Sequence, residues 1–459
     1  MSLNRKRRTA AIAGGLGLAL ALTACMPSDA ETETEPGDGG TTTAEGCEAY
    51  EQYGDLSGTT VSVYTSIVEP ESESQEASYD QFEECTGTTI EYEGSREFEA
   101  QLLVRLQAGN APDIAYLPQP GLLNTIVTQE PDAIVPAPDQ DEQNVEEFYS
   151  ESWKGYGSVG DEFYAAPLGA NVKSFVWYSP AMFEEAGYEV PETWDEMMQL
   201  TEDIAASGGT PWCAGIASGE ATGWPATDWL EDVVLRTAGP EAYDQWVNHE
   251  IPFNDPQILE ALETVGAILK NPNYVNGGLG EVQSIASTEW VDAGLPILDG
   301  TCWLHRAANF YQTQWPEGTD VSEDGDVFAF YLPSMNEGER PVLGGGEFVA
   351  AFADRPEVAA FQAFLSSPEW ANAKALATPE GGWVSANNGL DPENLSTEFD
   401  QLSAEILSDP QAVIRFDGSD LMPAAVGTGT FWREMTNWFA NDTPNQEVLD
   451  SIEASWPAS

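Results

Sequence analysis

Basic residues are scarce in this 459-residue chain, where 16 Lys and Arg stand against 78 Asp and Glu and give a formal net charge of −62. A chain with such an excess of negative charge repels nucleic acid and anionic lipid headgroups. We therefore expect no nucleic-acid partner. A well-solvated surface is the simple explanation for this acidity, and adaptation to salty surroundings, where counterions screen the self-repulsion, is the alternative.

Histidine is also scarce, and common enzyme signatures are missing. The sequence has no G-x-S-x-G elbow, no G-x-x-x-x-G-K-[ST] phosphate loop and no H-E-x-x-H zinc helix. The two histidines, His249 and His305, lack the spacing of a metal site or a Ser-His-Asp triad. Residues 320–326 imitate the first half of a calcium loop, but Tyr331 stands where a bidentate Glu is expected. We expect no metal, no cofactor and no catalytic residue.

Long apolar runs are absent apart from residues 10–22, which are too few for a bilayer span of about 20 residues. Four basic residues precede this run, as in a secretory signal. Leu22-Thr23-Ala24-Cys25 resembles the bacterial lipobox, whose cysteine receives lipid and becomes the mature N-terminus. We therefore expect a lipoprotein signal peptide over residues 1–24, lipidation of Cys25 and a disordered tether over residues 25–46. An ordinary cleaved signal is the alternative.

Cysteine is rare too, and its number is informative. If Cys25 is lipidated, Cys47, Cys85, Cys213 and Cys302 remain, an even number for an oxidising compartment. Three pairings are possible. Sequence proximity favours Cys47 with Cys85 and Cys213 with Cys302, because each pair then stays within one candidate lobe.

The remaining chain is longer than one hydrophobic core normally supports, so two lobes are expected. Strand patterns over residues 59–66, 88–94 and 112–118 alternate with helical patterns over 74–85 and 95–107, the second with Ser95 as its N-cap. This order predicts a parallel sheet covered by helices. Further along, Thr193 and Glu196 form a capping box, and Asp255 caps a second helix.

Five segments in order resemble the extracellular solute-binding proteins of bacterial ABC importers, the sugar-binding family that includes maltose-binding protein. They are residues 94–121, 164–197, 223–236, 343–352 and 415–435. The segments "ATGWPATDWLED" and "RFDGSDLMPAAVG" resemble receptors for alpha-glucosides such as sucrose, maltose and trehalose.

The resemblance implies an α/β, two-lobed periplasmic-binding-protein fold of type II. Each lobe is then a mixed sheet flanked by helices, and hinge crossovers join the two. The first lobe would hold residues 48–169 and 341–382, and the second 170–340 and 383–459. An oligosaccharide would bind in the cleft of a monomer, lipid-anchored outside the cell membrane, and pass to an ABC permease. A receptor for another oligosaccharide or a polyol is one alternative, and a secreted glycoside hydrolase is another.

A neutral sugar needs planar hydrogen-bonding groups and aromatic platforms in a concave site. Open sheets place such groups in loops at the carboxyl ends of their strands. Any single candidate could instead be a solvated loop residue, a core residue, a cap or half of an ion pair. The expected ligand-binding residues are Glu69, Arg96, Glu97, Gln119, Asn171, Lys173, Trp224, Asp228, Trp229, Gly345, Glu347, Arg415, Asp417, Asp420 and, by position in the family, Trp432.

The stretch "DGTCWLHR", residues 299–306, adds three candidates. Its Cys302 is expected to be structural, stapling this strand to the one that carries Cys213. Trp303 is then a platform for the sugar, held rigid by the disulfide. His305 and Arg306 lack the partners that catalysis needs, so they are expected as polar groups of the cleft wall.

Overall fold

The structure is a computed structural model that describes residues 47–276, 279–336 and 338–457. The predicted signal peptide, Cys25 and the predicted tether lie outside the described residues. No helix in the described part of the chain is long and apolar enough to cross a membrane.

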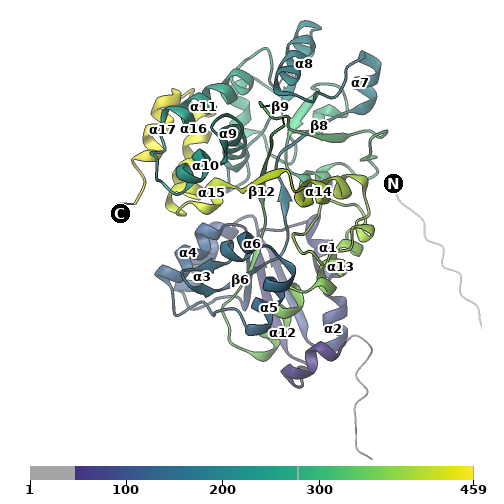
Figure 1. The fold of residues 1–459 in the computed structure, drawn as a ribbon, viewed down its shortest axis with the longest axis vertical. Helices are drawn as coiled ribbons and strands as arrows, with labels where there is room; N and C mark the ends of the chain where they lie inside the picture. Colours follow the sequence, from purple (N-terminus) through teal and green to yellow (C-terminus); the bar gives the residue numbers. More distant parts are fainter. Residues whose placement is uncertain (1–46, 277–278, 337, 458–459) are drawn as a thin grey trace, which may run out of the picture. The chain divides into compact units, whose positions relative to one another are not determined.

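The first lobe is built on a five-stranded mixed sheet, the lower sheet in Figure 1. Its first three strands are parallel, as predicted, while the fourth runs antiparallel to both of its neighbours. In sheet order they are β2 (Thr89–Gly94), β1 (Thr60–Thr65), β3 (Ile114–Leu117), β13 (Phe348–Ala351) and β6 (Ala165–Pro167).

Helices flank this sheet, and two of them differ from the sequence prediction. They are α1 (Glu71–Ala77), α2 (Asp80–Thr86), α3 (Phe98–Gln107), α4 (Pro120–Gln129), α5 (Asp139–Phe148), α6 (Glu151–Tyr156), α12 (Pro356–Leu365) and α13 (Pro368–Leu376), with the 3-10 helix η1 (Glu48–Tyr53) and the hairpin β4 (Ser158–Val159) and β5 (Glu162–Phe163). The predicted helix over 74–85 is split near Ser78, whose hydroxyl donates to the Gln75 carbonyl. Ser95 does not cap α3, because its Oγ accepts the Glu97 N–H in a turn before the helix.

The second lobe contains a four-stranded sheet, and a three-stranded sheet includes β12, whose residues span the predicted boundary at residue 340. The first has the order β11 (Phe328–Tyr331), β8 (Phe175–Tyr178), β10 (Leu304–Arg306) and β9 (Trp212–Cys213). The second has the order β14 (Ala412–Phe416), β12 (Arg340–Gly345) and β7 (Asn171–Val172). The strand β9 has only two residues.

The helices of this lobe include both that were predicted from their caps. The Thr193 and Glu196 capping box starts α8, and the Asp255 side chain caps α11. The helices are α7 (Pro180–Ala186), α8 (Trp194–Ala206), α9 (Trp224–Thr237), α10 (Gly239–Val247), α11 (Pro256–Leu269), α14 (Glu398–Ser408), α15 (Gly418–Leu421), α16 (Trp432–Ala440) and α17 (Asn445–Glu453). Shorter 3-10 turns are η2 (Val282–Ser287), η3 (Leu295–Ile297), η4 (Asn309–Gln314) and η5 (Pro392–Asn394), and η6 (Ala425–Phe431) is a π-helix.

Each lobe has its own hydrophobic core. The largest cluster packs around Trp177, Trp246 and Trp438 in the second lobe, whereas clusters around Phe361 and Phe98 lie in the first. The chain segments that pass between the lobes lie side by side. Ala170 pairs with Val384 in an isolated bridge, and the Leu168 N–H donates to the Glu347 carbonyl. The lobe boundaries stated above remain a prediction.

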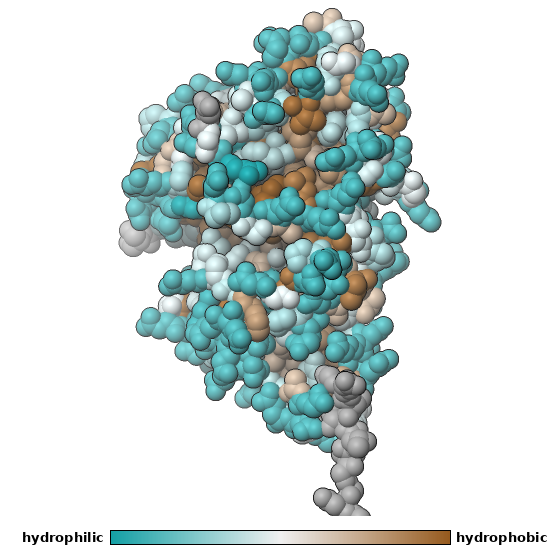
Figure 2. All heavy atoms as spheres, turned by 45° about the vertical axis from the view of Figure 1, so that its right-hand side comes forward, coloured by the Kyte–Doolittle hydropathy of each residue, from teal (hydrophilic) through white to brown (hydrophobic). Residues whose placement is uncertain are grey.

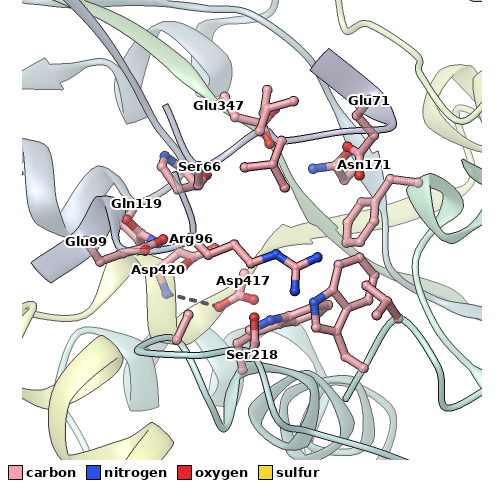
Figure 3. A pocket seen from close by; sticks show the side chains of 18 of the residues that line it. Ser66, Glu71, Arg96, Glu99, Gln119, Asn171, Ser218, Glu347, Asp417 and Asp420 are labelled. Atoms are coloured by element: carbon pink, nitrogen blue, oxygen red, sulfur yellow. Dashed lines mark hydrogen bonds between the residues drawn. The ribbon is translucent and has the colours of Figure 1, made fainter. Parts of the chain in front are cut away.

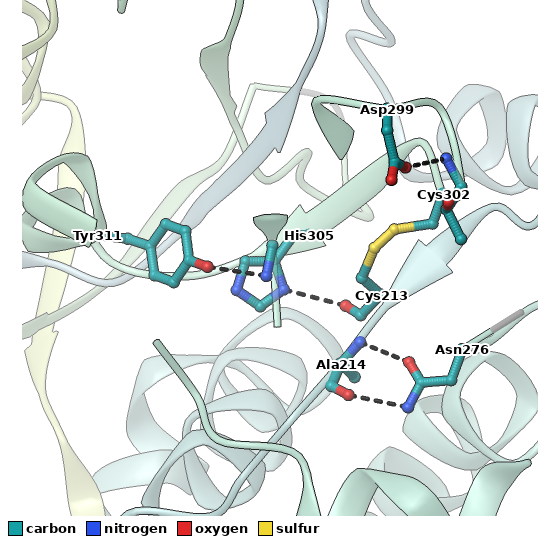
Figure 4. Close-up of a disulfide and its surroundings, with 9 residues drawn as sticks. Cys213, Ala214, Asn276, Asp299, Cys302, His305 and Tyr311 are labelled. Atoms are coloured by element: carbon teal, nitrogen blue, oxygen red, sulfur yellow. Dashed lines mark hydrogen bonds between the residues drawn. A yellow bond between two sulfur atoms is a disulfide. The ribbon is translucent and has the colours of Figure 1, made fainter. Parts of the chain in front are cut away.

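Two disulfides have the pairing that sequence proximity favours, Cys47 with Cys85 and Cys213 with Cys302. Figure 4 shows the second, which ties β9 to the loop just before β10. The face of the molecule in Figure 2 is mostly hydrophilic, as the acidic composition suggests.

Candidate functional site

A pocket with a cavity volume of about 190 Å³ lies between the lobes (Figure 3). Its first-lobe wall comes from the loops after three parallel strands: Ser66 to Glu69 after β1, Arg96 after β2, and Gln119 after β3. These loops meet at the carboxyl edge of the sheet because the strands are parallel. The second-lobe wall comes from the start of α9, η4, α15 and the start of α16.

Three aromatic rings form an apolar wall of this pocket. The Trp224 and Trp290 ring centroids are 5.3 Å apart, and Phe310 lies 6.0 Å from Trp224 and 5.8 Å from Trp290. All three side chains are half-buried, so part of each remains accessible. A fourth ring, Trp432, lines the pocket and donates its indole N–H to the Ser419 hydroxyl. Rings of this kind can stack on the apolar faces of a sugar.

A buried charge cluster borders the pocket. The Lys173 Nζ lies 3.1 Å from Asp228 Oδ1 and 2.5 Å from Asp417 Oδ2. Behind it, Arg306 contacts both Asp228 and Asp232 at 3.2 Å and 2.7 Å. Burial opposes ionisation of Asp417, but the Lys173 ammonium prevails and holds the pKa of that carboxyl well below its usual range. Lys173 and Asp417 therefore present fixed charges to the pocket.

Two carboxylates on the opposite side of the pocket are less firmly ionised. Burial and the nearby Glu347 carboxylate raise the pKa of Glu71 to about 7. Burial also raises the pKa of Glu347. The Glu71 carboxylate accepts a hydrogen bond at 3.2 Å from Gln314 of the second lobe, which connects the two walls. Near neutral pH, Glu71 can therefore act as a donor or as an acceptor.

Ten of the residues predicted to bind ligand line this pocket. They are Glu69, Arg96, Gln119, Asn171, Lys173, Trp224, Glu347, Asp417, Asp420 and Trp432. The structure brings them together from segments that are far apart in the sequence.

Three predicted residues from residues 299–306 lie away from the pocket. Trp303 packs on Tyr188 at 5.4 Å and Phe183 at 6.3 Å, on the outer side of the second lobe's sheet. His305 is buried, with Nδ1 3.0 Å from the Cys213 carbonyl, and burial lowers its pKa to about 4 (Figure 4). Arg306 is held by the charge cluster. His305 and Arg306 do not line the pocket, because β10 lies inside the sheet and its residues are buried. Trp303, directly before β10, does not line it either.

The other five predicted residues outside the pocket have structural partners or lie beside it. Asp228 belongs to the buried charge cluster, and Trp229 packs on Trp212 at 5.4 Å. Arg415 pairs with Asp244 at 2.6 Å. Gly345 leaves room for Lys173, since a Cβ there would lie 2.9 Å from Lys173 Cε. The exposed Glu97 precedes α3 beside the pocket.

Several residues that line the pocket were not predicted from the sequence. They are Ser66, Ile67, Val68, Glu71, Glu99, Pro118, Ser218, Ala221, Trp290, Val291, Phe310, Gln314 and Gly346. Glu99 had a usable signal, because it follows the same strand as Arg96 and lies three residues after it. Trp290 and Phe310 had none, since both come from irregular or 3-10 segments that only the tertiary fold brings together.

Comparisons with known proteins give a consistent picture. The family model described as "Bacterial extracellular solute-binding protein" matches residues 64–381. The "Osmoprotective compounds-binding protein GgtB" of Synechocystis sp. is 38% identical over 415 residues, covering 90% of this chain and 96% of that protein. The "Alpha-glucosides-binding periplasmic protein AglE" of Rhizobium meliloti is 35% identical over 445 residues, covering 92% of each.

Solved structures match the fold at lower identity. The bacterial solute receptor AcbH has a TM-score of 0.73 at 16% identity, covering 86% of this chain and 98% of its own. Maltose-bound MalE3 of T. maritima has a TM-score of 0.66 at 16% identity, with the same two coverages. These matches support the two-lobed arrangement of the described residues.

Proposed function

Because the chain belongs to the bacterial extracellular solute-binding proteins, we propose that it is the sugar receptor of an ABC importer and that it binds alpha-glucosides in the pocket between its lobes. One observation carries the ligand site: aromatic rings and planar polar groups from both lobes converge on a single pocket. Ligand contacts with both lobes at once favour the closed arrangement, which a permease can then recognise.

Two relatives support the ligand class. AglE is named for alpha-glucosides, and GgtB is named for osmoprotective compounds. Delivery to a permease, lipid anchoring through Cys25 and a monomeric state belong to the same proposal. The mass of the mature N-terminal peptide tests the anchor, because an unmodified Cys25 would exclude it.

A sugar panel tests the function. Incubation with maltose, sucrose and trehalose should raise the melting temperature for at least one of them, because a ligand that binds only the folded state stabilises it. The sugar should be recovered intact. Release of glucose would instead favour a glycoside hydrolase acting through two of the pocket carboxylates. A panel with no shift for any sugar would overturn the proposal.

A pair of tryptophan variants tests the location. Trp224→Ala should weaken the affinity for the bound sugar by about tenfold or more, because it removes a platform of the pocket. Trp303→Ala is the control, since that ring packs on Tyr188 away from the pocket. Calorimetry should find the control within about twofold of the unmodified protein. Equal losses in the two variants would place the sugar elsewhere.

A further inference from the structure

One end of the pocket is lined by two carboxyl groups and an amide oxygen. We call it the acceptor end and define it by the Glu99 carboxylate, the Gln119 side-chain oxygen and the Asp420 carboxylate, which Figure 3 shows on the same side of the pocket. Glu99 belongs to α3, Gln119 directly precedes α4, and Asp420 belongs to α15, so both lobes contribute.

A glycine lets the two lobes approach each other here. A Cβ at Gly121 would lie 2.1 Å from the Met422 carbonyl oxygen and 3.0 Å from that of Asp420. Its backbone φ is not positive, so the close approach itself is what requires glycine. The start of α4 therefore rests directly on α15, and Gln119 is held beside Asp420.

The Gln119 side-chain oxygen at this end lacks a donor. Gln119 is only 3% exposed, yet its Oε1 has no hydrogen-bond partner within the described residues. Its Nε2 makes a long 3.5 Å hydrogen bond to Glu99, which turns the carbonyl oxygen away from that carboxylate. Asp420 is 8% exposed, and the nearest cation, the Lys173 Nζ, is 4.0 Å from it. Buried acceptors are costly when unpaired, so a ligand that supplies donors gains affinity at this end.

Neither cation of the pocket makes a hydrogen bond to these carboxylates within the described residues. Lys173 is engaged by Asp228 and Asp417. The exposed Arg96 makes no ion pair within the described chain, and Figure 3 shows its guanidinium pointing away from Gln119 and Glu99 toward the middle of the pocket. The acceptor end therefore has room for a cation that hydrogen-bonds its carboxylates directly.

We propose that the acceptor end binds a protonated amino group of the ligand, so that the receptor prefers an amino-substituted glucoside over its neutral parent. This inference rests on the proposed function of the pocket. An ammonium group brings three donors and one positive charge to a single position, whereas a hydroxyl brings one donor and no charge. Its hydrogen bonds to carboxylates are charge-assisted and correspondingly stronger.

Proton exchange should accompany this binding. In the empty pocket, burial and the nearby Asp417 charge raise the pKa of Asp420, and burial raises the pKa of Glu99. An ammonium placed between them favours the ionised carboxylates, so its arrival should expel a proton. A neutral sugar has no such effect. The number of protons released is therefore a readout of contact with the acceptor end itself.

The test compares maltose and trehalose with their mono-amino-deoxy analogues and with the N-acetyl form of each analogue as a neutral control. Calorimetry in two buffers of different ionisation enthalpy gives both affinity and proton release. At least one amine should bind ten times more tightly than its parent and release a proton, and its N-acetyl form should do neither. If the neutral sugars bind and no amine binds more tightly, this inference fails and the proposed function stands. If nothing binds, the proposed function fails.

Two variants locate the effect. Asp420→Asn should reduce the preference for the amine to within twofold and abolish proton release, and Glu99→Gln provides the same test should Asp420→Asn fold poorly. Glu347→Gln is the matched control, because it removes a pocket carboxylate that Figure 3 shows well away from the acceptor end. If both Asp420→Asn and Glu99→Gln still preferred the amine, the preference would come from the general negative potential of the pocket. That result would overturn the proposal.

Discussion

Asp141 is a fully buried carboxyl group in the first lobe, and neither of its oxygens has a hydrogen-bond partner of acceptable geometry within the described residues. Burial raises its pKa to about 7, against a smaller opposing effect of the Ser366 hydroxyl. In the unfolded chain an Asp titrates near 3.9. The folded state therefore binds more protons between these values, and this residue lowers stability as the pH rises from about 4 to 7.

Replacing Asp141 with Asn should remove that pH dependence. We expect Asp141→Asn to be more stable than the unmodified protein at pH 8, by up to about 4 kcal/mol, and to match it near pH 4. Urea denaturation at both pH values measures the difference. Asp139→Asn, at the exposed start of the same helix, is the control and should change stability by less than about 1 kcal/mol. Equal effects of Asp141→Asn at both pH values would contradict this explanation.

Individual site residues could be predicted where local rules decide their position. Arg96 and Gln119 follow strands of a recognisable parallel pattern, so the carboxyl-edge rule predicts their place beside the pocket. His305 and Arg306 lie away from this pocket, because β10 is an interior strand, which the sequence does not reveal. Trp290 and Phe310 could not be predicted, since only the tertiary fold of the second lobe brings their rings into contact.

At the scale of elements, β9 is a short strand held by a disulfide as well as by hydrogen bonds. The strand has two residues and lies at the edge of its sheet, where Trp212 and Cys213 pair with Leu304 and His305 of β10. On its other side, the Trp212 N–H donates to the Tyr274 carbonyl, and the Trp212 carbonyl accepts the Asn276 N–H. The bond between Cys213 and Cys302 fixes the register and closes a chain segment with a sequence separation of 89, which restricts the unfolded chain.

Removal of this disulfide should cost stability without affecting the ligand. The double variant Cys213→Ala/Cys302→Ala should lose about 2–5 kcal/mol of unfolding free energy. Its sugar affinity should stay within about twofold, because neither cysteine lines the pocket. Urea denaturation and calorimetry measure the two quantities. The corresponding Cys47→Ala/Cys85→Ala variant controls for the loss of any disulfide. A large loss of affinity in a variant of unchanged stability would give Cys213 and Cys302 a role at the ligand site.

Some helix boundaries are set by residues nearby in the sequence, and others are set by tertiary contacts. The caps of α8 and α11 were predictable, because Thr193 with Glu196 and Asp255 act within one turn of their own helices. The break between α1 and α2 was not. There Ser78 accepts a hydrogen bond from the Trp370 indole, and Tyr79 bonds Tyr116 across 37 residues of chain. Contacts between residues so far apart in the sequence cannot be predicted from the pattern of a short segment.

The whole molecule carries 78 acidic residues against 16 basic ones. Several of the basic side chains are buried with acidic partners, as Lys173, Arg236 and Arg306 are, so they do not offset the negative charge of the surface. The exposed carboxylates therefore repel one another in the folded state more than in the expanded unfolded chain. If the acidity reflects salty surroundings, added salt should stabilise the folded protein by screening this repulsion.

The melting temperature should rise steadily between low salt and about 1 M, where the screening length falls from tens of ångströms to about 3 Å. NaCl and KCl should act equally if screening alone is the cause. A variant with about ten exposed Asp and Glu residues changed to Asn and Gln should melt higher than the unmodified protein at low salt and respond less to added salt, because it has less repulsion to screen. A melting temperature that did not rise would mean that the acidity serves solvation alone. A rise with only one of the two salts would indicate a bound cation in place of screening.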